Sequence, residues 1–144
     1  MHDLIERRAI MHQGQCLCGK VKLSTTQDIS ALSVCHCSMC LRWNGGPGFS
    51  IDCKSDLKIE GEENITRYDS SSWGERAFCK HCGSHLFYHL KETHTYYVSA
   101  GLFPDAKESK LTMQIYIDSK PHYYNFVEKT PMLTEQDIMN MFNQ

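Results

Sequence analysis

Seven of the eight cysteines in this chain of 144 residues fall into three short clusters. In chain order the clusters are Cys16/Cys18, Cys35/Cys37/Cys40 and Cys79/Cys82. Thiols this close in sequence do not easily form a disulfide with each other, but their sulfurs can turn toward one metal ion. Four thiols from the two pairs would complete a closed tetrahedral zinc site, and the remaining three would leave one position open. The spacing therefore predicts two zinc ions, one structural and one catalytic.

The two cysteine pairs have the spacing of ligands to a structural zinc. Cys16 and Cys18 are two residues apart, so both sulfurs leave the same face of an extended backbone. Cys79 and Cys82 precede Gly83, as in a zinc knuckle whose tight turn directs backbone amides at the sulfurs. One zinc on all four thiols would join the first strand to a hairpin in the middle of the chain. The alternative, four unmetallated buried thiols, would be an unusual way to fill a core.

Cys35, Cys37 and Cys40, here called the cysteine trio, predict the catalytic zinc. They lie close together in the chain and no fourth cysteine is near them in sequence. The open position would take water or an incoming thiolate, and because zinc prefers sulfur, a small-molecule thiol is a natural ligand. Zinc would lower the pKa of that thiol and hold it as a nucleophile aimed at an aldehyde.

Four residues could instead close this second site as a structural zinc, namely Cys53, His36, His81 and His85. A lone cysteine in a strand pattern, such as Cys53, is more often a core residue. His36 lies between two cysteines of the trio and is expected to point away from the metal. Glycine-rich residues 45–48 follow the trio and could offer backbone N–H groups to an oxyanion, or form an ordinary turn.

The elements that must position these clusters are predicted to be mainly strands. Val21, Leu23 and Thr25 alternate with polar residues, as in a half-buried strand. Turn residues separate further short runs of strand character, at 31–35, 49–53, 57–61, 65–69, 75–79, 85–90, 95–100 and 113–117. Many short strands without long amphipathic helices predict a mostly β fold of antiparallel strands.

Two short helices are also predicted. Thr134 with Asp137 resembles a capping box and predicts a C-terminal helix. A second short helix is expected at 38–43, directly over the end of the cysteine trio.

Composition restricts the classes of partner. The chain has 15 Lys+Arg against 17 Asp+Glu, a formal net charge of −2, and seven thiolates on two zinc ions would make it about −5. Either charge argues against nucleic acid as a partner, because phosphate binding needs a net basic face. No apolar run could span a bilayer and the N-terminus has no apolar signal core, so no membrane partner is expected. A cytoplasmic location is expected, since thiols stay reduced there.

The cysteine clusters lie within three longer motifs. They are Gly14-x-Cys16-x-Cys18-Gly19-x-Val21, Cys35-His36-Cys37-x-x-Cys40 and Phe78-Cys79-x-x-Cys82-Gly83-Ser84-x-Leu86. Together they resemble the glutathione-dependent formaldehyde-activating enzyme (GFA) family, which includes the domain of centromere protein V. The resemblance runs from about Gly14 to Tyr124, most of the chain.

This resemblance implies a β-tent fold built around zinc. It implies a structural zinc on the two cysteine pairs (Cys16, Cys18, Cys79 and Cys82) and a catalytic zinc on the trio (Cys35, Cys37 and Cys40). The activity it implies is that of S-(hydroxymethyl)glutathione synthase, a carbon–sulfur lyase class reaction in which glutathione adds to formaldehyde.

The chain departs from the family pattern at two places. Family members often carry His-Ile in a late strand and then Lys-x-Pro-Trp, whereas here Gln114 replaces the histidine and His122 replaces the tryptophan. These changes bear on the substrate rather than on the fold. Family chains usually begin just before the first Cys-x-Cys, and Met11 is well placed for that start. That start would leave residues 1–10 as an upstream extension. Because the resemblance begins at Gly14, we expect an N-terminal extension over residues 1–13 and one zinc-binding β domain over 14–144.

The sequence supports one leading hypothesis about function and one alternative. The leading hypothesis is a zinc-dependent enzyme of carbon–sulfur chemistry, with a small-molecule thiol such as glutathione and an aldehyde as its partners. The alternative is a non-catalytic zinc-binding module, which would carry a thiol or dock a protein. A zinc-ribbon protein that binds nucleic acid is disfavoured by the charge.

Overall fold

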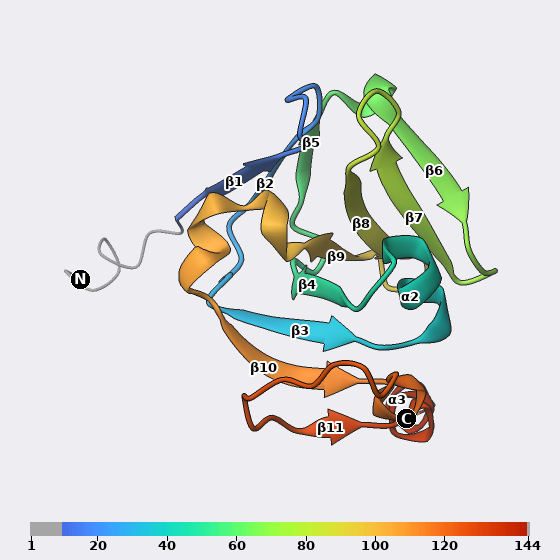
Figure 1. The fold of residues 1–144 in the computed structure, drawn as a ribbon. Helices are drawn as coiled ribbons and strands as arrows, with labels where there is room; N and C mark the ends of the chain where they lie inside the picture. The colour runs from blue at the N-terminus through green and yellow to red at the C-terminus, as the bar shows by residue number, and fades with distance from the viewer. Residues whose placement is uncertain (1–9, 144) are drawn as a thin grey trace, which may run out of the picture.

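The computed structural model describes residues 10–143, which form two β-sheets (Figure 1). One sheet has three strands in the order β1-β2-β5, and the other has eight in the order β11-β10-β3-β4-β9-β8-β7-β6. The strands are β1 (His12–Gln15), β2 (Lys22–Thr25), β3 (Ala31–Cys35), β4 (Gly48–Asp52), β5 (Lys58–Glu60), β6 (Ile65–Asp69), β7 (Gly74–Cys79), β8 (His85–Leu90), β9 (Thr95–Ser99), β10 (Lys110–Ile115) and β11 (Met132–Leu133). The predicted mostly β fold of short strands is confirmed.

Both predicted helices are present. Helix α2 (Ser38–Asn44) follows β3, and helix α3 (Glu135–Phe142) ends the described chain. Thr134 caps α3, because its Oγ1 accepts the Asp137 N–H at 3.1 Å and the Asp137 carboxylate accepts the Thr134 N–H at 2.9 Å. The described chain also has short 3₁₀ helices, namely η1 (Glu62–Asn64), η2 (Ala100–Leu102), η3 (Pro104–Glu108) and η4 (Ile117–Ser119). None of the helices in residues 10–143 is long and apolar enough to cross a membrane.

Two strand pairings are parallel, unlike the rest. Strand β10 runs parallel to both β3 and β11, whereas the other strand pairs are antiparallel, as expected. Parallel neighbours need a long connection, and the chain between β10 and β11 supplies one that includes η4. The strand predicted at 113–117 ends at Ile115, because Tyr116 adopts a left-handed backbone with φ 56°. Strands β1 and β11 were not predicted.

Residues 1–9 of the expected N-terminal extension lie outside the described residues. Its last two residues, His12 and Gln13, belong to β1 and pair with Thr25 and Ser24 of β2.

The central strands of the larger sheet have one apolar and one polar face. Residues directly opposite each other in neighbouring strands share a face, as do residues two apart along a strand. The apolar face, which is buried in the core, carries Val34, Ile51, Val98, Phe87 and Ala77. The opposite face, here called the polar face, carries Cys35, Ser50, Tyr97, Tyr88 and Arg76. The sheet therefore brings an arginine of β7 to the same face as the cysteine that ends β3.

Gly61 is a position at which both the backbone conformation and the surrounding space require glycine. Its φ is +88°, and an added Cβ would lie 2.1 Å from the backbone oxygen of Lys20, which belongs to the loop after Cys18. Gly61→Ala should lower the free energy of unfolding by about 1–3 kcal/mol, since it combines backbone strain with a clash. Gly101→Ala is the control, because no atom lies within 4 Å of its added Cβ. Urea titration of the two variants checks this, and equal losses would contradict it.

Candidate metal centres

The two cysteine pairs converge in space on one site, here called the four-cysteine site. The sulfurs of Cys16, Cys18, Cys79 and Cys82 all lie within 4.8 Å of one another. Two of the separations are 3.6 Å (Cys16 to Cys18) and 3.7 Å (Cys18 to Cys79). A disulfide would need about 2.05 Å, whereas tetrahedral zinc with Zn–S bonds of about 2.3 Å places its sulfurs about 3.8 Å apart. The donor set and spacing therefore fit a closed zinc site.

Tight turns present each pair of sulfurs. In the first loop, the Val21 N–H donates to the sulfur of Cys16 at 3.4 Å. In the second loop, the Gly83 N–H donates to the Cys79 carbonyl at 2.7 Å, and Gly83 has a left-handed φ of 78°. The glycine predicted to close the knuckle therefore does so, because a residue with a side chain rarely adopts this backbone conformation.

Ser84 links the two loops of the four-cysteine site. Its hydroxyl accepts the N–H of Leu17 from the first loop at 3.0 Å and lies 3.2 Å from the sulfur of Cys82 in the second. Hydrogen bonds from the Ser84 hydroxyl and backbone lower the pKa of Cys82 to about 5. A thiolate at neutral pH is the form that ligates zinc.

Asn64 also joins the two loops. Its side-chain amide donates to the Lys20 carbonyl in the first loop at 3.1 Å, and its Oδ1 accepts from His81 Nε2 in the second loop at 2.8 Å. Its backbone carbonyl accepts the Lys80 N–H at 2.9 Å. Asn64 was not predicted as part of the site, because the spacing of an asparagine in a turn does not show which two loops it contacts.

The cysteine trio forms a second cluster, at the junction of β3 and α2. The sulfurs of Cys35, Cys37 and Cys40 lie within 4.8 Å of one another. Cys35 ends β3, and Cys37 is the N-cap of α2, where its sulfur accepts the Cys40 N–H at 3.3 Å. Hydrogen bonds from Cys35 and then Cys40 hold the pKa of Cys37 well below its ordinary value, with a further contribution from the positive charge of Arg76. Hydrogen bonds with Cys37 and Cys40 raise the pKa of Cys35, so Cys37 is the thiol of the trio that most readily carries a negative charge.

Three of the alternative ligands for the trio lie elsewhere. Cys53 is buried in the core, and burial raises the pKa of its thiol to about 11. His81 binds Asn64, as described above. His85 stacks on Trp43, with ring centroids 4.6 Å apart. Among the described residues, no Cys, His, Asp or Glu joins the three sulfurs of the trio as a fourth potential ligand.

His36, the fourth alternative, is fully buried and bonded away from the sulfurs. Its Nε2 donates to Gln114 Oε1 at 2.9 Å, and its Nδ1 accepts from the Tyr124 hydroxyl at 2.6 Å. The Gln114 amide donates in turn to Thr130 Oγ1 at 3.4 Å, which orients the glutamine. Gln114, one of the two departures from the family pattern, therefore orients His36, which lies between two cysteines of the trio. His122, the other departure, is exposed.

The glycine-rich segment after the trio forms a turn. Gly45 caps the C-terminus of α2 with a left-handed φ of 72°, and Gly48 pairs with Cys35 at the start of β4. An added Cβ on Gly48 would lie 3.6 Å from the Cys40 sulfur. The segment therefore returns the chain directly past the trio.

Arg76 contacts the trio and was also missed from the sequence. Only 7% of it is exposed, and its Nη2 lies 3.7 Å from the sulfur of Cys40. No carboxylate among the described residues forms an ion pair with it. A buried cation is costly without a compensating charge. Three thiolates and a zinc dication carry one net negative charge, so a metal-loaded trio would compensate Arg76.

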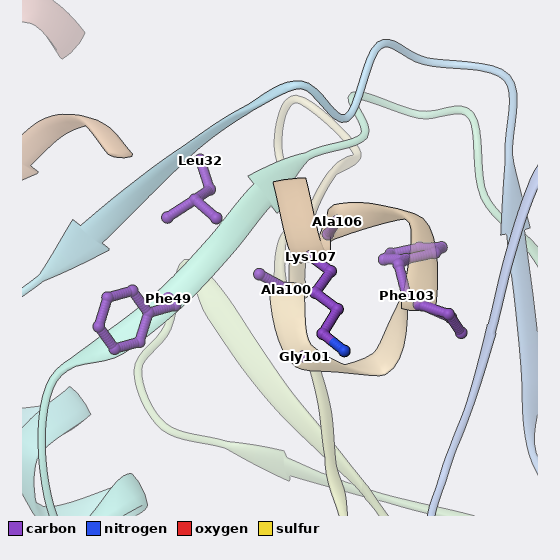
Figure 2. A pocket seen from close by; sticks show the side chains of 8 residues that line it. Leu32, Phe49, Ala100, Gly101, Phe103, Ala106 and Lys107 are labelled. Carbon is purple, nitrogen blue, oxygen red and sulfur yellow. The ribbon is translucent and has the colours of Figure 1, made fainter. Parts of the chain in front are cut away.

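An apolar groove lies apart from these cysteines. Leu32, Phe49, Phe103 and Lys107 are among the residues that line this groove of about 420 Å³ (Figure 2). Leu32 and Phe49 lie on the apolar face of the sheet, opposite the face that carries Cys35. No cysteine lines the groove.

Residues 10–143 thus define a mostly β protein in which two clusters of cysteines could each hold a metal ion. The sequence model of the family described as glutathione-dependent formaldehyde-activating enzyme matches residues 11–119, and this chain belongs to that family.

Known proteins resemble the chain over most or half of its length. A Schizosaccharomyces pombe protein named as an uncharacterized lyase is 34% identical over 129 residues, which cover 89% of this chain and 94% of that protein. A Halomonas elongata protein, named provisionally as a glutathione-dependent formaldehyde-activating enzyme, is 32% identical over 84 residues, covering 52% of this chain and 54% of that protein. A crystal structure of a Rhodobacter sphaeroides protein shows the same fold, with a TM-score of 0.56 and 24% identity over 69% of this chain and 99% of that chain.

Counting bound zinc by native mass spectrometry tests the division into two sites. The parent should hold two ions, and Cys40→Ala should hold one while keeping its fold. Cys79→Ala should lose about 4 kcal/mol or more of unfolding free energy, the size expected when a structural metal is lost. Cys53→Ala is the matched control and should keep both ions, because Cys53 lies in neither cluster. Two ions in Cys40→Ala would contradict the assignment of the trio.

Asn64 gives a sharper test of the four-cysteine site. Asn64→Ala removes the bonds to Lys20 and His81 without touching a sulfur, so zinc affinity at this site should fall about 10–100-fold. Competition with a chromophoric chelator measures the affinity. Asn140→Ala, on the exposed surface of α3, should leave it unchanged. Equal affinities in the two variants would show that the loops hold together without Asn64.

Proposed function

We propose that the chain is a zinc-dependent enzyme of the carbon–sulfur lyase class that forms S-(hydroxymethyl)glutathione from glutathione and formaldehyde. The observation that carries the proposal is the cysteine trio, which has three converging sulfurs and no fourth potential ligand among the described residues. Membership of the family and the names of its relatives support this chemistry.

Each cluster receives its own role in this proposal. The four-cysteine site would hold a structural zinc, because its four sulfurs would close the coordination sphere. Cys35, Cys37 and Cys40 would hold the catalytic zinc. When bound there, zinc would act as a Lewis acid that favours the thiolate form of an incoming thiol. Reduced thiols in both clusters agree with a cytoplasmic location.

The surrounding residues would supply charge and orientation. Arg76 would offset the negative charge of the trio. Tyr88 and Tyr97 lie on the polar face, and burial raises the pKa of both hydroxyls, which therefore stay protonated. Burial likewise raises the pKa of Tyr116 to about 12. We assign no general acid or base, because a thiolate held close to a reactive carbonyl gains mainly from proximity.

Magnetization exchange between formaldehyde and glutathione tests the proposal. Zinc-loaded parent protein should accelerate formation of the adduct above the spontaneous rate, as measured by NMR exchange spectroscopy. Cys40→Ala should return the rate to the spontaneous value, because one of the three sulfurs is lost. Cys53→Ala should behave as the parent. No acceleration by protein that holds two zinc ions would refute the synthase. Tight binding of glutathione without turnover would instead favour the thiol carrier.

A further inference from the structure

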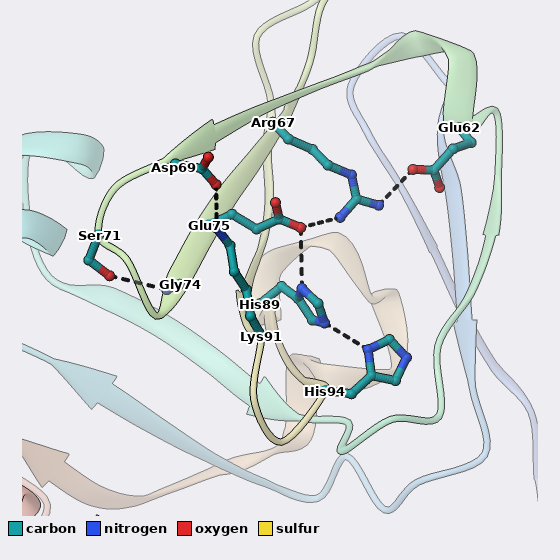
Figure 3. A network of polar contacts seen from close by, with 9 residues as sticks. All are labelled: Glu62, Arg67, Asp69, Ser71, Gly74, Glu75, His89, Lys91 and His94. Atoms are coloured by element: carbon teal, nitrogen blue, oxygen red, sulfur yellow. Dashed lines mark hydrogen bonds and ion pairs between the residues drawn. The ribbon is translucent and has the colours of Figure 1, made fainter.

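Two arginines on neighbouring strands have opposite surroundings. Arg67 of β6 donates to Glu62 at 2.6 Å and to Glu75 at 2.7 Å, so two carboxylates share its charge (Figure 3). It pairs with Ala77, and its side chain therefore lies on the apolar side of the sheet, with its guanidinium 5.2 Å from the centre of the Phe87 ring. Its positive charge is therefore balanced within the protein.

Arg76 of β7 lies on the polar face and has no such partners. Among the described residues it forms no ion pair with a carboxylate, although it is the more deeply buried of the two arginines. Its Nη2 contacts the Cys40 sulfur at 3.7 Å, whereas its Nε is buried without any hydrogen-bond partner in the described part of the chain. A buried N–H that is left without an acceptor destabilises a protein. In the described part of the chain this N–H of Arg76 is therefore unused.

Neighbouring residues hold the Arg76 guanidinium in place. It lies over the ring of Tyr88, 5.1 Å from the ring centre, on the adjacent strand β8. Tyr88 in turn lies against Gly74, where an added Cβ would be 2.1 Å from the tyrosine hydroxyl. The absence of a side chain at Gly74 thus makes room for the ring that supports Arg76. An unpartnered donor held this way beside three thiols has the properties of a binding site for an oxyanion.

We infer that Arg76 forms an oxyanion subsite beside the cysteine trio, where it binds the oxygen of the aldehyde. This inference rests on the proposed function. When the thiolate sulfur attacks, its electron pair forms the new C–S bond, the carbonyl π bond breaks and that pair moves to oxygen. The negative charge therefore passes from sulfur to oxygen. The proton that the thiol released to water returns from water to this oxygen and completes the hydroxymethyl group.

The chemistry explains why an arginine without a carboxylate partner suits this position. A cation already neutralised by glutamates, as Arg67 is, would have little attraction left for a developing alkoxide. Arg76 contacts a cysteine of the trio and also keeps an unused N–H. Its guanidinium therefore lies beside the cysteine trio, where the charge would move from the sulfur of the substrate thiol to the oxygen of the aldehyde.

Sodium ¹³C-formate is a suitable probe, since it is a small planar oxyanion close in size to formaldehyde. Binding to zinc-loaded protein is measured by ¹³C NMR line broadening, after mass spectrometry has confirmed two zinc ions. Arg76→Met should weaken formate binding about 10–100-fold, as expected for loss of a charge-assisted hydrogen bond. Arg67→Lys is the matched control and should bind formate like the parent. Parent-like affinity in Arg76→Met, or no binding by the parent, would overturn the subsite.

Arg76→Lys covers the case in which Arg76→Met loses zinc from the trio. It keeps the positive charge but lacks the planar fork and Nε. Weakened formate binding with both zinc ions retained supports the subsite, whereas parent-like binding overturns it. In the synthase assay, the same variant should lower the rate at saturating glutathione about 100-fold, with the KM for glutathione unchanged.

The formate titration separates this inference from the proposed function. If the parent shows no synthase activity but binds formate in a way that depends on Arg76, the proposed reaction is refuted and the oxyanion subsite is supported. Synthase activity together with formate binding that does not depend on Arg76 would refute the oxyanion subsite and leave the proposed reaction standing.

Discussion

The convergence of four sulfurs from two distant segments is the constraint on which the rest of the structure depends. Cys16 and Cys18 come from the loop between β1 and β2, whereas Cys79 ends β7 and Cys82 lies in the turn between β7 and β8. Cys16 and Cys79 are also members of the buried core, so the site and the core are continuous. The small three-strand sheet is thereby held against the end of the larger one. Ser84 and Asn64 bond both loops around the sulfurs and leave them little freedom to separate.

The cysteine trio has a different relation to the fold. Its three sulfurs come from one strand end and the first turn of one short helix, so it joins no distant parts of the chain. The residues from distant parts of the sequence that contact the trio or its neighbour His36 supply positive charge and orientation, not further metal ligands. Arg76 arrives from β7, and Gln114 of β10 orients His36. Because the trio does not cross-link distant segments of the chain, a metal ion bound there can keep one coordination position open for a substrate.

Local patterns predicted what depends on neighbours in sequence. The two close cysteine pairs, the trio, the Gly83 turn and the Thr134 cap each follow from spacing over a few residues, and all are present. That the two pairs meet at one site was inferred from the number of ligands that zinc needs and from the family resemblance. The parallel strand β10 and the contacts of Arg76 depend instead on the order of strands in the sheet. Alternation along β7 could place Arg76 on a face, but only the pairings from β7 through β8, β9 and β4 to β3 show that this face also carries Cys35. Gln114 was noticed as a departure, while its contact with His36 required the structure.

The sequence separation of the four-cysteine site has a consequence for biosynthesis. Cys18 and Cys79 are 61 residues apart, whereas the trio lies within six residues of chain. Closing the longer loop costs more chain entropy and requires long-range strand pairing, which slows folding. A ribosome also synthesises both Cys18 and the trio before it makes Cys79. If both clusters take zinc as proposed, a nascent chain can load the reactive ion before the structural one.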